Sequence, residues 1–215
     1  MDKKKFVVGM IVFGSLWGFS ECIIGPAMGD AGFPSGAIMG GLFAVGLMVL
    51  SRSMFRQPGM QLGMGLIAGC MRMFNPFGSC IVCSAIAIAA EAALFELIWS
   101  AISKDLHKSK NPVMMVSLGV ISGYSVFVGG YIVTQILTPI VSSSTFYLEN
   151  LIAFLPQILA RGTLAAILGA IIVPVALLMR IPDISKVKDR LYYPTAMGIS
   201  VISWVIVIGN FLLSA

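Results

Sequence analysis

The sequence predicts an all-α fold, a polytopic bundle of membrane-spanning helices. Hydrophobic residues make up 58% of the 215 residues and charged residues only 11%, whereas a typical soluble domain carries about 25% charged residues. Because so few charges cannot cover the surface of a soluble protein, lipid is the expected solvent for most of the chain. Residues 1–215 are predicted to form one transmembrane helical domain in the plasma membrane.

Seven apolar runs are long enough to cross a bilayer as helices, which takes about 17–25 residues. They cover residues 6–28, 35–51, 59–75, 79–103, 113–141, 150–180 and 192–213. The fifth and sixth runs are long and can tilt or include an interfacial turn. Within the sixth, residues 149–161 are a candidate for a separate surface helix, with a kink or break at Pro156.

The basic residues cluster at alternate ends of these runs, as lysine and arginine do in the cytoplasmic loops of membrane proteins. The segments before run one and after runs two, four and six hold 12 of the 14 basic residues. These are Lys3, Lys4, Lys5, Arg52, Arg56, Lys104, Lys108, Lys110, Arg180, Lys186, Lys188 and Arg190. The pattern predicts a cytoplasmic N-terminus and, with seven spans, a C-terminus outside. Nucleic acid is not an expected partner, because the basic residues are not pooled on one face or tail.

A secretory signal peptide is the competing interpretation of residues 1–28. The apolar core of such a peptide has about 7–15 residues, whereas this run is longer and contains Glu21. We therefore expect the segment to be the first membrane-spanning helix.

Apart from Arg180, which ends the sixth run, five charged residues lie inside the predicted spans and are the first candidates for a functional site. They are Glu21, Arg72, Glu91, Glu96 and Arg161. An ionised group at the bilayer centre costs about 2.5–3.5 kcal/mol on insertion scales, so such groups usually face the bundle interior and pair with another group.

Glu21 and Arg72 each follow two glycines at the same spacing, in residues 14–21 and 65–72. Helical geometry places each charge on the face of its glycines, and small residues allow helices to pack closely. Both side chains are therefore expected to face the bundle interior at similar depth in its outer half. They either form an ion pair or face one cavity, and a purely structural pair is the alternative.

The fourth run carries a stripe of small and weakly polar residues that ends in an acid. Cys80, Ser84, Ala87 and Glu91 share one helical face. This stripe is either the wall of a cavity or a helix-packing seam. Glu96 lies nearly opposite and deeper toward the cytoplasm, so we expect it to have a different partner.

The four cysteines, Cys22, Cys70, Cys80 and Cys83, are all predicted in the outer half of the membrane. Inert buried thiols, a disulfide or C-x-x-C redox pair and a soft-metal site are all open. His107, the one histidine, falls in a predicted cytoplasmic loop too distant to join them. No metal and no cofactor is therefore predicted.

The fifth run adds Tyr124, Tyr131 and Gln135, which suit a flat organic ligand, although interior tyrosines also hydrogen-bond to neighbouring helices. Asn75 lies in an outer turn that is a candidate lid, FNPFG. Arg161, near the outer end of the sixth run, is either an interfacial anchor or a second cation above the cavity. The chain contains no P-loop and cannot drive ATP-dependent transport alone.

Three segments carry a resemblance to a known family: LWGFSE at 16–21, FPSGAIMGG at 33–41 and GLIAGCMRMF at 65–74. With the chain length, the basic inside loops and the glycine-rich spans, they resemble the substrate-binding membrane subunits (S components) of energy-coupling-factor transporters. The resemblance covers roughly residues 9–100. The family commonly has six spans, so either 192–213 is an addition or the count near 150–161 is wrong.

The resemblance implies a small organic nutrient or metal ion bound toward the outer face. It also implies a separate transmembrane coupling subunit and two ATPases as partners. In that family a small-xxx-small patch on the first span contacts the transmembrane partner, and Gly14 and Gly18 match it here, although alanines are usual.

The leading prediction is a solute-binding subunit for uptake of a small polar or zwitterionic nutrient, rather than an enzyme. The predicted substrate-binding residues are Glu21, Arg72, Asn75, Cys80, Cys83, Glu91, Tyr124, Tyr131, Gln135 and Arg161. Two alternatives are a membrane thiol or quinone redox enzyme that uses Cys80 and Cys83, and a stand-alone transporter coupled to protonation of Glu91 or Glu21. An assembly or scaffold protein is a further alternative.

Overall fold

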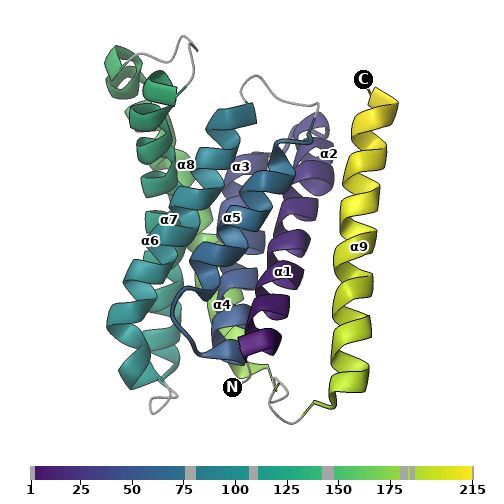
Figure 1. The fold of residues 1–215 in the computed structure, drawn as a ribbon. Coiled ribbons are helices and arrows are strands. Elements are labelled where there is room, and N and C mark those ends of the chain that lie inside the picture. Colours follow the sequence, from purple (N-terminus) through teal and green to yellow (C-terminus); the bar gives the residue numbers. More distant parts are fainter. Residues whose placement is uncertain are drawn as a thin grey trace.

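In a computed structural model, the chain is a bundle of helices that run alternately up and down (Figure 1). The structure describes residues 3–75, 81–106, 111–141, 148–179, 184 and 187–214. No strand occurs within these ranges, so the predicted all-α bundle is confirmed. Six of the described helical runs are long and apolar enough to cross a membrane, and the chain is a multi-pass membrane protein.

The first two spans each contain a π-helical segment between α-helical parts. The first consists of α1 (Lys3–Phe19), η1 (Ser20–Ile24) and α2 (Gly25–Asp30), and the second of α3 (Ser35–Ile38), η2 (Met39–Ala44) and α4 (Val45–Phe55). A π-helical turn holds more residues than an α-helical turn and is often found at functional sites. It therefore changes the direction in which the residues beyond it point.

Five further helices follow: α5 (Met60–Arg72), α6 (Ile81–Leu106), α7 (Pro112–Val141), α8 (Leu148–Leu178) and α9 (Asp189–Ser214). With 13 residues, α5 is about 20 Å long, which is less than the roughly 30 Å of a bilayer core. Helix α8 continues through Pro156, so the separate surface helix expected at 149–161 is wrong.

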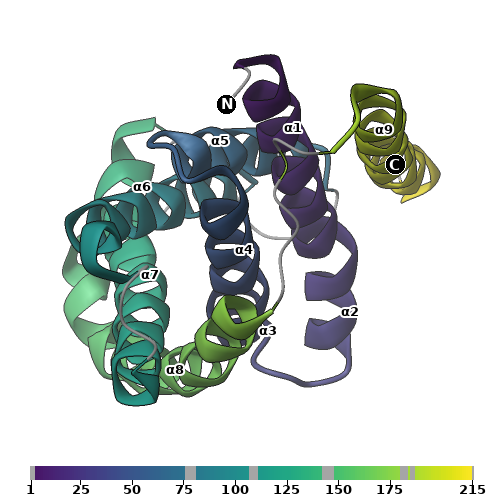
Figure 2. The same ribbon diagram turned by 90° about the horizontal axis from the view of Figure 1, so that it is seen from below.

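The second span lies at the centre of the bundle. Its segments pack against α1, α5, α7 and α8, whereas α9 lies at the edge beside α1 (Figure 2). The main core includes Trp17, Met48 and Phe95, each fully buried. Helix α9 thus lies on the outside of the bundle that the preceding helices form.

Basic residues gather at one end of the bundle. Helices α1 and α9 begin there and α4 ends there, at the bottom of Figure 1. At this end Lys5 Nζ pairs with Asp189 Oδ1 at 2.8 Å, and the Tyr192 hydroxyl donates a 2.8 Å hydrogen bond to the Lys5 carbonyl oxygen. These contacts join the start of α9 to the start of α1. By the positive-inside rule this end is cytoplasmic.

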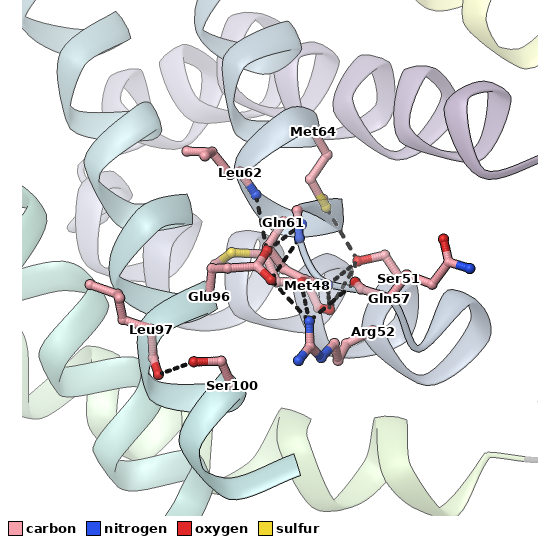
Figure 3. A network of polar contacts seen from close by, with 11 residues as sticks. Met48, Ser51, Arg52, Gln57, Gln61, Leu62, Met64, Glu96, Leu97 and Ser100 are labelled. Carbon is pink, nitrogen blue, oxygen red and sulfur yellow. Dashed lines mark hydrogen bonds and ion pairs between the residues drawn. The ribbon is translucent and has the colours of Figure 1, made fainter. Parts of the chain in front are cut away.

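Glu96 stabilises the start of α5 near the same end (Figure 3). Arg52 Nη1 donates to Glu96 Oε1 at 3.0 Å, and the Glu96 carboxylate also accepts the backbone N–H groups of Gly59 at 2.9 Å and Gln61 at 3.0 Å. The first N–H groups of a helix have no partner within that helix, and a carboxylate there is also favoured by the helix dipole. As predicted, Glu96 has its own partner, and its role in the structure is to hold α4, α5 and α6 together.

Candidate functional site

A cavity of about 430 Å³ lies at the end of the bundle away from the basic residues. Its walls come from η1, α2, α3, η2, α5, α6 and α7. Pockets for small molecules usually measure about 300–1,000 Å³. The ionisable residues that line it are Glu21, Asp30, Arg72 and Glu91. By the charge distribution the cavity is on the outer side of the membrane.

Glu21 and Arg72 line this cavity together. Trp17 Nε1 donates a hydrogen bond to Glu21 Oε1 at 3.3 Å, and Arg72 Nη1 donates one to the backbone carbonyl oxygen of Glu21 at 3.4 Å. The guanidinium therefore lies beside the π-helical segment that carries Glu21. The sequence left open an ion pair, two groups that face one cavity, and a purely structural pair. The arrangement in the structure is the second of these.

Glu91 projects from α6 between two glycines of neighbouring helices. A Cβ atom on Gly40 in η2 would lie 3.7 Å from Glu91 Oε1, and one on Gly130 in α7 would lie 2.7 Å from Glu91 Cγ. The two glycines thus leave room for the acidic side chain. Among the residues that the structure describes, none donates a hydrogen bond to Glu91 or forms an ion pair with it.

Ser84 and Ala87 also line the cavity, about two turns and one turn before Glu91 respectively. The stripe expected on the fourth span therefore forms part of a cavity wall over these residues. Cys80, the first member of the predicted stripe, lies outside the described residues, as does His107.

An aromatic wall comes from Phe127 and Tyr131 on α7, with ring centroids 6.2 Å apart and planes inclined by 41°. A Cβ atom on Gly40 would lie 3.5 Å from Cδ2 of Phe127, so this ring and the Glu91 carboxylate lie side by side over Gly40. Sequence reasoning missed Phe127. A signal was present, because Phe127 precedes Tyr131 by four residues and so shares its helical face.

Three of the predicted site residues do not line the cavity. Tyr124 packs at Gly162 of α8, and it lies about 10 Å along α7 from Tyr131 at 1.5 Å per residue. Gln135 is 5% exposed, and its Oε1 has no hydrogen-bond partner among the described residues. Arg161 is exposed on α8 and does not line the cavity, and the choice between its two expected roles stays a prediction.

Asn75 and the described cysteines also lie away from the cavity lining. Asn75 is buried, and its Nδ2 donates to the backbone carbonyl oxygen of Cys22 at 3.5 Å, which ties the end of α5 to η1. Cys83 is disulfide-bonded, while Cys22 and Cys70 are free thiols. Within the described ranges, no group of three His, Cys, Asp or Glu residues is placed to hold a metal ion.

Gly14 and Gly18 pack against α5 of the same chain. A Cβ atom on Gly14 would lie 2.7 Å from Cβ of Ile67, and one on Gly18 would lie 2.8 Å from Cβ of Met71. Both glycines are therefore packed against α5 within the chain, and their role as contacts to a partner subunit stays a prediction. Glu21, which lies in the π-helical segment that follows, lines the cavity although both glycines face α5.

A second cavity, of about 460 Å³, lies between α1, α4 and α9 near the cytoplasmic end. Residues such as Phe13, Phe55 and Ile184 line it, and its described lining includes no charged side chain. It offers no charged group that would pair with a charged solute among its described lining residues, so the outer cavity is the stronger candidate site.

The outer cavity combines carboxylates, a guanidinium and two aromatic rings in a space suited to a small organic molecule. These groups can bind and orient a solute through charge pairing and ring contact. Comparison of the chain with family models, curated proteins and solved structures found no match.

Proposed function

We propose that this chain is a membrane-embedded subunit that binds a small polar or zwitterionic nutrient for uptake. It would act in the plasma membrane, with separate transmembrane and ATPase subunits that supply the driving force. The observation that carries the proposal is the outer cavity, in which Glu21, Arg72 and Glu91 lie beside two aromatic rings. Intramembrane charges that face a cavity commonly mark the path of a solute or ion.

The geometry agrees with a binding role in two further respects. The cavity lies at the end of the bundle away from the basic loops, where a solute would arrive from outside. It also lies beside both π-helical segments, because Glu21 comes from η1 and Met39 and Gly40 come from η2. Such segments place side chains where a regular helix would not.

Native mass spectrometry of the purified full chain tests the binding role. The chain is incubated with the small-molecule fraction of a cell extract and then desalted. The solutes that remain bound are released from the protein and identified by mass. We expect wild type to retain a small solute and Glu91→Gln to retain less of it. An Asp189→Asn chain is the matched control, because Asp189 pairs with Lys5 far from the cavity. Wild type that retains no solute would contradict the proposal.

The proposed partners are tested by affinity purification of the tagged chain from its native membrane. Co-purification of a second membrane protein with ATPase subunits is expected. Transport by the chain alone in liposomes would point instead to the second candidate, a stand-alone ion-coupled transporter. That candidate is favoured by Glu91, whose carboxyl group has no hydrogen-bond partner among the described residues and can therefore carry a proton.

A further inference from the structure

The charges that line the outer cavity do not balance. Three carboxylates, those of Glu21, Asp30 and Glu91, face one guanidinium, that of Arg72, among the described lining residues. Arg72 is already engaged at Glu21, where Nη1 donates to the backbone carbonyl oxygen. Among the described lining residues, no second cation lies beside Asp30 or Glu91. Of these two, Glu91 lies in the middle of the Ile81–Ser100 span, whereas Asp30 is the last residue of the Lys3–Asp30 span.

Glu91 lies where a cation would be held from two sides. Its carboxylate oxygen and the Phe127 ring both approach Gly40, at 3.7 Å and 3.5 Å from a Cβ position there. Tyr131 continues the aromatic wall from Phe127. A positive group at this point would pair with the carboxylate, and its apolar body would contact the Phe127 ring. An anion would meet repulsion from the carboxylate.

The glycine at position 40 is itself part of this arrangement. A side chain there would occupy the space between the ring and the carboxylate, whereas glycine leaves it open to the cavity. The open volume beside Glu91 is thus in contact with a charged group and an aromatic surface at once. Apolar surface for the rest of a ligand is provided by Met39 and Ile88.

We propose that the solute of this cavity is an organic cation, with an ammonium or amidinium group held by Glu91 and an apolar or aromatic body packed on Phe127 and Tyr131. This inference rests on the proposed function and narrows its substrate class. It favours a net positive solute over a zwitterion or an anion, because carboxylates outnumber guanidiniums by three to one among the described lining residues.

Three probes of similar shape and different charge test the inference on the full chain in detergent. Phenethylamine is cationic, 2-phenylethanol is neutral and phenylacetate is anionic. Binding is measured by titration calorimetry and by the shift of the thermal unfolding midpoint. We expect phenethylamine to bind at least about tenfold more tightly than the other two, because a desolvated charge pair is lost with each of them.

Two variants assign the preference to Glu91. Glu91→Gln keeps the side-chain shape and removes the charge, so we expect it to abolish the preference for phenethylamine. Asp189→Asn, the control outside the cavity, is expected to retain the preference. Equal binding of the three probes, tighter binding of phenylacetate, or a preference that survives Glu91→Gln would overturn the inference.

The retained-solute experiment separates this inference from the proposed function. A retained organic cation supports both. A retained neutral, zwitterionic or anionic solute leaves the binding role intact and overturns the cation inference alone. Retention of no solute, together with equal or absent stabilisation by all three probes, overturns both.

Discussion

Two neighbouring glycines of η2 provide a sharp test of which surface packs and which surface forms the cavity. Gly40 faces the cavity, and a Cβ atom there would meet Phe127 and Glu91 no closer than 3.5 Å. Gly41 faces α8, where a Cβ atom would lie 2.6 Å from the backbone oxygen of Ala165 and 2.7 Å from its Cα. The same substitution by alanine should therefore have opposite effects at the two positions.

The magnitudes follow from these distances. At Gly41 the obstacle is backbone, so α8 must move, and overpacking of this kind costs about 1–3 kcal/mol. Replacement of a helical glycine by alanine recovers about 0.5–1 kcal/mol, which leaves Gly41→Ala destabilised by up to about 2.5 kcal/mol. At Gly40 the contact is an ordinary van der Waals distance, so Gly40→Ala should be neutral or up to about 1 kcal/mol more stable.

The assay is the thermal unfolding midpoint of the full chain in one detergent, followed by titration with phenethylamine. A change of 1 kcal/mol moves the midpoint by about 2–4 °C in a chain of about this length. We expect Gly41→Ala to lower the midpoint and Gly40→Ala to keep or raise it while weakening phenethylamine binding, because the new methyl group lies between Phe127 and Glu91. A lower midpoint for Gly40→Ala than for Gly41→Ala would refute the reasoning.

Three further predictions concern the scaffold. Glu96→Ala removes the carboxylate that pairs with Arg52 and that accepts backbone N–H groups at the start of α5. The free energy of unfolding should therefore fall by about 3–5 kcal/mol. A fall of less than about 1 kcal/mol would contradict the role given to the network of Figure 3. Tyr192→Phe removes the 2.8 Å hydrogen bond to the Lys5 carbonyl and should cost about 1 kcal/mol in the same assay, with an unchanged midpoint as the contrary result. A tag after Ala215 should be cleaved by protease added to intact cells while a tag before Met1 is protected, and the reverse pattern would invert the topology.

Helical periodicity and the spacing of charged residues were sufficient to predict much of the fold. The apolar runs and the alternating basic segments predicted the multi-pass helical architecture. Each membrane-spanning segment must be apolar along its own length, so each can be recognised without knowledge of its neighbours. The same local logic identified Glu21, Arg72 and Glu91 as inward-facing groups, and all three line one cavity. Each of these predictions needed only the angle of a residue about its own helix and its depth along that helix.

What the sequence by itself determined, then, is which face of each helix avoids lipid; which helix meets that face was decided only by the tertiary structure. Gly14 and Gly18 show the difference, because a small-residue face packs equally well on another subunit or on α5 of the same chain. Tyr124 and Arg161 were predicted to contact the solute. Tyr124 packs instead at Gly162 of α8, and Arg161 is exposed and does not line the cavity. The π-helical segments of the first two spans leave no period in the sequence that a count of residues can detect.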